Sequence, residues 1–152
     1  MGDMARADGW NRAFWLASAS LALPIAAVAA AAGFTTPHAE PARDLGVLAL
    51  WSVAEEIVFR GALQPALARL FGRRGTDRLA PWLTRSNVAT SAVFAAAHLW
   101  RHPWPLALAV FPVSIVYGRA REISGEWWPA ALLHLWFNAC LYAASWWLST
   151  AS

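Results

Sequence analysis

The sequence is poor in charge and in cysteine. Only 14% of its 152 residues are charged, and its single cysteine, Cys140, excludes an internal disulfide. A soluble domain usually carries about a quarter charged residues, so this chain lacks the polar surface that water requires. Hydrophobic residues make up 59% of the chain, and its mean hydropathy is +0.40. These values indicate a single domain, 1–152, that is embedded in a membrane.

Lysine is absent as well, because all twelve basic residues are arginines. The formal net charge is +3, yet most arginines lie in short stretches between apolar segments. No extended basic face can form from this pattern, which excludes nucleic acid as a partner. Membrane lipid is the partner that the composition predicts.

Five apolar segments follow one another along the chain and predict an all-α, polytopic membrane helix bundle of about five transmembrane helices. A membrane-crossing helix needs about 20 residues, a length that the first, second and last segments reach. The third and fourth predict a tight helical hairpin, with Ser86 or Asn87 capping the third. Nine of the eleven tryptophans lie near segment ends, where membrane interfaces favour indole rings. The segments are 12–34, 45–71, 86–101, 104–118 and 127–149.

The first segment, 12–34, is expected to be an N-terminal transmembrane helix, although its flanking residues also resemble those of a cleaved signal peptide. Orientation follows from the arginines, which collect on the cytoplasmic side of membrane proteins. With the N-terminus cytoplasmic, nine arginines fall inside, several of them in the loop at 72–85, and two fall outside. The C-terminus is then expected outside. The inner arginines are Arg6, Arg12, Arg69, Arg73, Arg74, Arg78, Arg85, Arg119 and Arg121.

Segment 45–71 carries three charged residues in its middle, Glu55, Glu56 and Arg60. Each such charge costs roughly 2.5–3.5 kcal/mol at the centre of a membrane, so three together indicate a specific role. Glu56 and Arg60 are four residues apart in the favourable order and are expected to form an ion pair. Glu55 lies about 100° around the helix from this pair, which leaves its carboxylate for chemistry as a general base.

Two other segments place polar groups within apolar sequence. His98 ends an alanine-rich stretch that lets another helix approach closely, and His134 and Asn138 lie four residues apart on one helix face. Because a buried polar group must find a partner, these helices are expected to converge their polar faces on one cavity. A lone membrane histidine is more often a packing contact. Its combination with Glu55 and an ion pair indicates a hydrolytic site.

Three motifs resemble those of a known family. The stretches EEIVFRG at 55–61, FAAAH at 94–98 and HLWFN at 134–138 match, in order, the EExxxR, FxxxH and HxxxN/D motifs of the CPBP intramembrane proteases. That family includes the CAAX prenyl endopeptidases and bacteriocin-processing and self-immunity proteins. The resemblance covers 45–149, the catalytic helical core. The short chain is also similar to the small members that accompany C-terminal sorting signals, the JDVT-CTERM type.

The resemblance implies a glutamate-dependent endopeptidase of a bacterial-type inner (cytoplasmic) membrane. Its substrate would be a membrane-anchored protein or peptide that is cleaved near its C-terminus. Glu55 would activate water with assistance from His98, and His134 and Asn138 would stabilise the oxyanion of the tetrahedral intermediate. The ion pair beside Glu55 would be structural support.

Other chemistries find less support in the sequence. It lacks the HExxH of site-2-type metalloproteases, a GxS serine, and aspartates within its membrane segments. Two histidines and two glutamates could ligate zinc, but neutralisation of Glu56 by Arg60 favours a site without metal or cofactor. A metal-dependent protease and a non-enzymatic immunity or scaffolding protein of the same fold remain alternatives. A transporter is disfavoured because no repeat symmetry is present.

Overall fold

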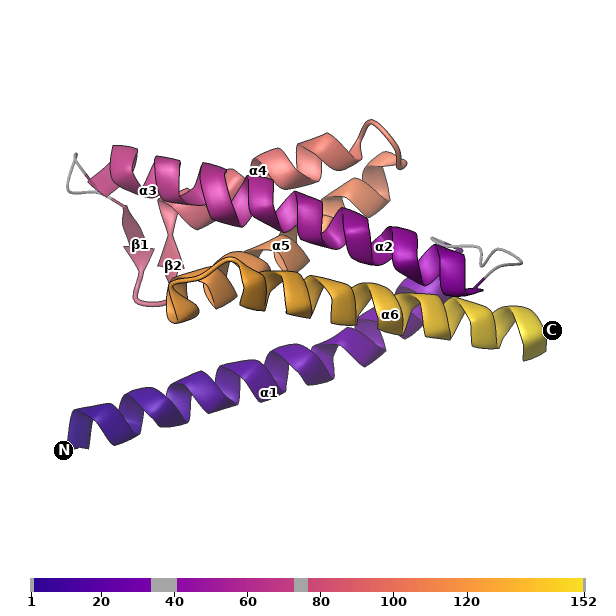
Figure 1. The fold of residues 1–152 in the computed structure, drawn as a ribbon, viewed down its shortest axis with the longest axis horizontal. Coiled ribbons are helices and arrows are strands. Elements are labelled where there is room, and N and C mark those ends of the chain that lie inside the picture. The colour runs from indigo at the N-terminus through magenta and orange to yellow at the C-terminus, as the bar shows by residue number, and fades with distance from the viewer. Residues whose placement is uncertain (1, 34–40, 73–76, 152) are drawn as a thin grey trace. The chain divides into compact units, whose positions relative to one another are not determined.

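The computed structural model describes residues 2–33, 41–72 and 77–151, and these are almost entirely helical (Figure 1). A π-helix, η1, joins α2 to α3 without a break, so the described residues form five helical rods and one small hairpin. The all-α prediction is confirmed. In chain order the elements are α1 (Gly2–Ala31), α2 (Pro41–Glu56), η1 (Ile57–Leu63), α3 (Gln64–Gly72), β1 (Arg78–Ala80), β2 (Leu83–Thr84), α4 (Arg85–His98), α5 (Trp104–Ser124) and α6 (Trp128–Ala151).

Several boundaries differ from the sequence prediction. Helix α1 begins at Gly2, ten residues before the predicted start at 12. Helix α5 continues six residues beyond the predicted end at 118, so that Arg119 and Arg121 lie within a helix and not in a loop. It ends where Gly125 adopts a positive φ of 77° and donates its backbone N–H to the carbonyl of Arg121, a helix end that glycine favours. The predicted loop at 72–85 contains the antiparallel pair β1–β2; residues 73–76 lie outside the described part.

The start of α4 also differs from the prediction. Thr84 is its N-cap and accepts a hydrogen bond from the backbone N–H of Asn87, while Ser86 and Asn87 are buried in the first turn. Asp77 accepts two further hydrogen bonds at this helix end, from the backbone N–H and the hydroxyl of Ser86. These contacts attach the hairpin to α4.

By length and composition, Arg12–Ala31 is the one helix of the described chain that could span a membrane, with a mean hydropathy of 1.8. Charged residues such as Glu55 and Arg60 lower the mean hydropathy of the stretch between Pro41 and Gly72. The number of five transmembrane helices therefore stays a prediction.

The chain forms two compact units, one of residues 1–50 and 133–152 and the other of residues 51–132. In the first unit, small buried residues recur every four positions along α1, a pattern that allows close helix approach. The indole N–H of Trp136 on α6 donates to the carbonyl of Ala19 at 3.0 Å. The small residues are Ser18, Ala22, Ala26 and Ala30.

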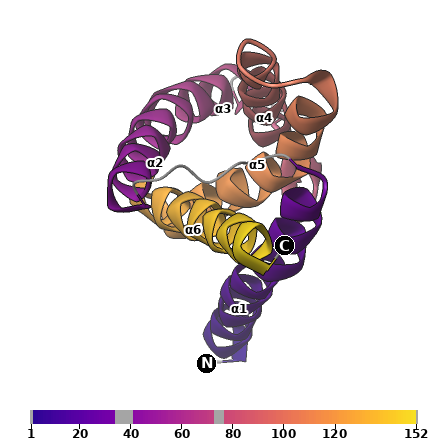
Figure 2. The same ribbon diagram turned by 90° about the vertical axis from the view of Figure 1, so that its right-hand side faces the viewer.

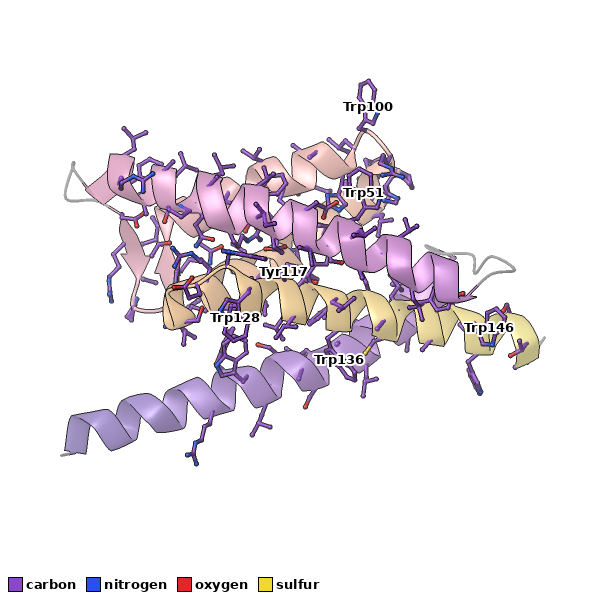
Figure 3. All side chains as sticks on the ribbon, viewed as in Figure 1. Trp51, Trp100, Tyr117, Trp128, Trp136 and Trp146 are labelled. Atoms are coloured by element: carbon purple, nitrogen blue, oxygen red, sulfur yellow. The ribbon has the colours of Figure 1, made fainter. Side chains whose placement is uncertain are left out.

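The second unit, residues 51–132, has a polar interior and an apolar exterior. Its largest fully buried side chains include Arg60, Glu56, Asn87 and Thr90. Large apolar side chains point outward instead, and Figure 3 shows Trp100, 92% exposed, projecting away from the helices. Soluble proteins show the reverse arrangement, whereas a bilayer is a suitable solvent for an apolar exterior.

Within this unit α4 and α5 meet at a close contact between Asn87 and Gly118. The carboxamide Nδ2 of Asn87 donates to the carbonyl of Ile115 at 3.1 Å, and its Oδ1 accepts from the hydroxyl of Ser91 at 3.2 Å. A methyl group at position 118 would overlap the Asn87 carboxamide. Glycine is therefore needed at 118 because of the close approach of another side chain.

We expect Gly118→Ala to destabilise the protein by about 1–3 kcal/mol, the usual effect of overpacking a well-packed contact. Thermal unfolding in detergent micelles measures this as a lowered Tm. Gly72→Ala is the matched control, because a Cβ at position 72 meets no atom within 4 Å. Equal Tm values for the two variants would contradict the assigned contact.

Candidate active site

A buried ion pair lies at the junction of α2 and η1. The Nε atom of Arg60 is 3.3 Å from Oε2 of Glu56, and both side chains are fully buried. These two atoms are not aligned for a hydrogen bond, so the contact is an ion pair and not a charge-assisted hydrogen bond. The pairing that the i, i+4 spacing predicts is thus present.

Arg60 extends this ion pair to two other helices. Its Nη2 donates to the carbonyl oxygen of Ser114 at 2.7 Å and to the Ser114 hydroxyl at 2.6 Å, both on α5. Its guanidinium carbon lies 5.0 Å from the ring centroid of Phe94 on α4 and 5.9 Å from that of Tyr117 on α5, within the range of cation–π contacts. One guanidinium therefore holds η1, α4 and α5 together.

His98 at the end of α4 has a defined tautomer. Its Nδ1 lies 2.8 Å from the carbonyl oxygen of Phe94, and a carbonyl can only accept, so Nδ1 carries the proton. In the neutral ring Nε2 is then the nitrogen with a lone pair, able to accept a proton or a hydrogen bond. The imidazole also packs on Phe94, with 4.6 Å between ring centroids.

Two contacts show how Glu55 and His98 are arranged along their helices. Phe94 contacts Arg60 at one end, and at the other end Arg101 lies 5.4 Å from the ring of Trp51. The partners occur in reverse chain order, so the two segments run antiparallel; α3 and α4 pack together in the same unit (Figure 2). Glu55 lies about midway between Trp51 and Arg60, and His98 lies about midway between Phe94 and Arg101. The two residues therefore lie at a similar level along the antiparallel segments.

The environments of the two adjacent carboxylates differ. Glu56 is fully buried in its ion pair, whereas Glu55 is half-buried on another face of α2. Glu55 is also close enough to Arg60 to interact with it electrostatically. Of the two neighbouring carboxylates, Glu55 is therefore the more accessible one.

His102 follows His98 by one helical turn, in the connection between α4 and α5. The two imidazole rings are stacked with centroids 5.8 Å apart. Partial burial, and secondarily the neighbouring His98 and Arg101, lower the pKa of His102 below its usual value. Its ring is consequently neutral at neutral pH and adds no positive charge beside His98.

His134 and Asn138 lie one turn apart on α6, where His134 is buried and Asn138 is half-buried. They belong to the unit of residues 1–50 and 133–152, whereas Glu55 and His98 belong to the unit of 51–132. The convergence of all four on one cavity stays a prediction of the sequence.

The sequence did not predict three residues that form buried polar or cation–π contacts in the 51–132 unit. Ser114 and Tyr117 lie in the fourth apolar segment, from which no polar partner was predicted, and Asn87 was predicted only as a cap. Hydroxyl groups are common in membrane helices and give no distinctive pattern. A usable signal was the spacing of Ser114 and Gly118, two small residues four apart that let other side chains reach the backbone of α5.

Zinc fits these residues poorly. Oε2 of Glu56 faces the guanidinium of Arg60, and a metal would compete with that charge. Among the residues that the structure describes, no group of three or more histidine, cysteine, aspartate or glutamate side chains could hold a metal ion. Structural and catalytic zinc sites use at least three protein ligands. The metal-free site itself stays a prediction.

Ionisable side chains inside an apolar helical shell are typical of membrane-embedded enzymes, and a comparison with known families specifies the class. Residues 37–140 match the model of the type II CAAX prenyl endopeptidase Rce1-like family, a match that includes all three motifs and more than half of the chain. The chain therefore belongs to this family of membrane proteases, which confirms the resemblance. No curated protein and no solved structure matches it.

We expect Glu56→Gln to lower the amount of folded protein. The substitution keeps the size of the side chain but leaves the buried charge of Arg60 without its carboxylate, which typically costs about 3–5 kcal/mol. Protein yield and Tm after purification in detergent measure the effect. Glu126→Gln, at an exposed position, is the matched control. A Glu56→Gln protein as abundant and as stable as the control would show that the ion pair is dispensable for folding.

Proposed function

We propose that this protein is a metal-free, glutamate-dependent intramembrane endopeptidase. Glu55 acts as the general base, His98 assists it, and His134 and Asn138 donate hydrogen bonds to the oxyanion. Family membership supports peptidase activity of this general kind. The observation that carries the finer assignment is the division between two adjacent carboxylates, with Glu56 held by Arg60 and Glu55 half-buried at the depth of His98.

The reaction follows from these roles. Glu55 takes a proton from water as the water oxygen attacks the carbonyl carbon of the substrate, and Nε2 of His98 accepts a hydrogen bond that orients this water. The carbonyl oxygen becomes negatively charged, and donors from His134 and Asn138 stabilise that charge in the transition state. Protonated Glu55 then gives its proton to the leaving amine as the C–N bond breaks. The carboxylate of Glu55 is regenerated, so no other reactant is needed.

The proposed substrate is a membrane-anchored protein or peptide that is cleaved near its C-terminus. The family name refers to prenylated proteins, and a prenyl group would hold such a substrate in the lipid beside the apolar exterior. We further propose that the enzyme resides in a bacterial-type inner (cytoplasmic) membrane with its N-terminus in the cytoplasm. The distribution of the arginines supports this orientation.

Glu55→Gln is expected to abolish cleavage while the protein folds normally. Glutamine matches glutamate in size but cannot accept the proton of the attacking water, and loss of a general base lowers the rate by about 10²–10⁴-fold. The assay uses an internally quenched peptide with a prenylated cysteine near its C-terminus, with the purified enzyme in bicelles. Glu126→Gln serves as the control. Undiminished cleavage by a folded Glu55→Gln protein would exclude Glu55 as the base and favour a binding role for the fold.

Chelators are expected to leave the rate of the same peptide cleavage unchanged, because the carboxylate of Glu56 is occupied by Arg60. The purified enzyme is incubated with EDTA or phenanthroline, and the metal content is measured in parallel. Loss of activity that added zinc restores would establish the metal-dependent alternative.

A further inference from the structure

Pro65, two residues after the end of the π-helix η1 at Leu63, leaves a backbone carbonyl of η1 without its regular partner. At the end of η1 the backbone N–H of Gln64 donates to the carbonyl of Phe59, five residues earlier. The next bond of this series would run from residue 65 to the carbonyl of Arg60. Residue 65 is proline, which has no N–H to donate. The regular pattern therefore provides no backbone donor for the Arg60 carbonyl.

A side chain from α5 takes the place of this donor. Nε of Arg121 donates to the carbonyl oxygen of Arg60 at 3.2 Å, and the Arg121 side chain is half-buried. A carbonyl inside a membrane protein must find a partner, because the bilayer offers no water to replace it. The contact joins residues 61 positions apart in the chain and occurs at the residue whose guanidinium pairs with Glu56.

We propose that Arg121 is a positioning residue for the catalytic carboxylate, a role that rests on the proposed function. A π-helix bonds residue i to residue i+5, one residue further than an α-helix. The extra residue rotates α2 relative to α3, so η1 determines the face on which α2 presents Glu55. Pro65 favours η1 because it cannot form the α-helical bond to the Gly61 carbonyl. In the π-helical register it cannot bond to the Arg60 carbonyl either, and Arg121 supplies that carbonyl with a donor. Arg121 thus acts on Glu55 through the backbone of Arg60.

Arg119 provides a matched comparison on the same helix. It is also a partly exposed arginine, and its Nη1 pairs with Glu122 at 3.2 Å, three residues along α5. This partner lies on its own helix, whereas the partner of Arg121 lies on η1. Removing Arg119 therefore removes the same charge from α5 and leaves the donor to the Arg60 carbonyl in place.

The test is a double-mutant cycle between residues 121 and 65. Arg121→Met keeps the length of the side chain and removes the donor, whereas Pro65→Ala gives residue 65 an N–H of its own. We expect Arg121→Met to lower kcat on the prenylated quenched peptide by about tenfold or more, with KM changed less than about twofold. In the Pro65→Ala background the same change should have less than about a threefold effect on kcat. Arg119→Met should leave kcat and KM near those of the wild-type enzyme.

Amide hydrogen exchange over residues 57–64 provides a second readout that does not depend on activity. Arg121→Met should speed this exchange by about tenfold, and Arg119→Met should not. If Glu55→Gln shows the proposed function to be wrong, the exchange result still tests the contact. Arg121→Lys, which keeps a donor, should be intermediate and serves if Arg121→Met does not accumulate. Equal kcat losses with and without the Pro65→Ala change, a rise in KM alone, or unchanged exchange would each overturn the proposal.

Discussion

The buried charge of Arg60 is the constraint on which the structure of the 51–132 unit depends, because a guanidinium stays charged at every accessible pH. Its side chain is fully buried, so protein atoms must compensate its charge, although only Nη2 forms hydrogen bonds and Nε and Nη1 form none. Glu56 supplies the opposite charge, Ser114 two acceptors and Phe94 an aromatic face. Because these partners come from α2, α4 and α5, satisfying one cation fixes the arrangement of three helices.

This constraint also separates the roles of two chemically identical neighbours. Glu55 and Glu56 differ only in which face of the helix they occupy. Glu56 is fully buried and pairs with Arg60, whereas Glu55 is half-buried. Enzymes often assign different tasks to two carboxylates by giving them different environments. Here the environment is set by the spacing to Arg60, so the choice of base follows from the position of the arginine.

The sequence predicted the helical segments and the Glu56–Arg60 pair, because both depend on local spacing along one helix. It did not predict η1, since a pattern of apolar residues does not reveal whether a turn contains an extra residue. The extension of α5 beyond 118 was missed because the charges of Arg119, Arg121 and Glu122 end the apolar segment from which the helix was predicted. Their side chains instead bond within α5 or to η1 and α3. The approach of His134 and Asn138 to the other candidate residues stays a prediction.

Polar and cation–π contacts stabilise both ends of the 51–132 unit. At one end Glu122 accepts hydrogen bonds from Gln64, Thr84 and Arg119, which joins α3, β2 and α5. At the other end Arg101 packs on Trp51. Hydrolysis requires groups held in nearly productive geometry before the substrate arrives, and rigid support from outside the site achieves this best. The contacts of Glu122 and of Arg101 thus support, from both ends, the helices that carry Glu55 and His98.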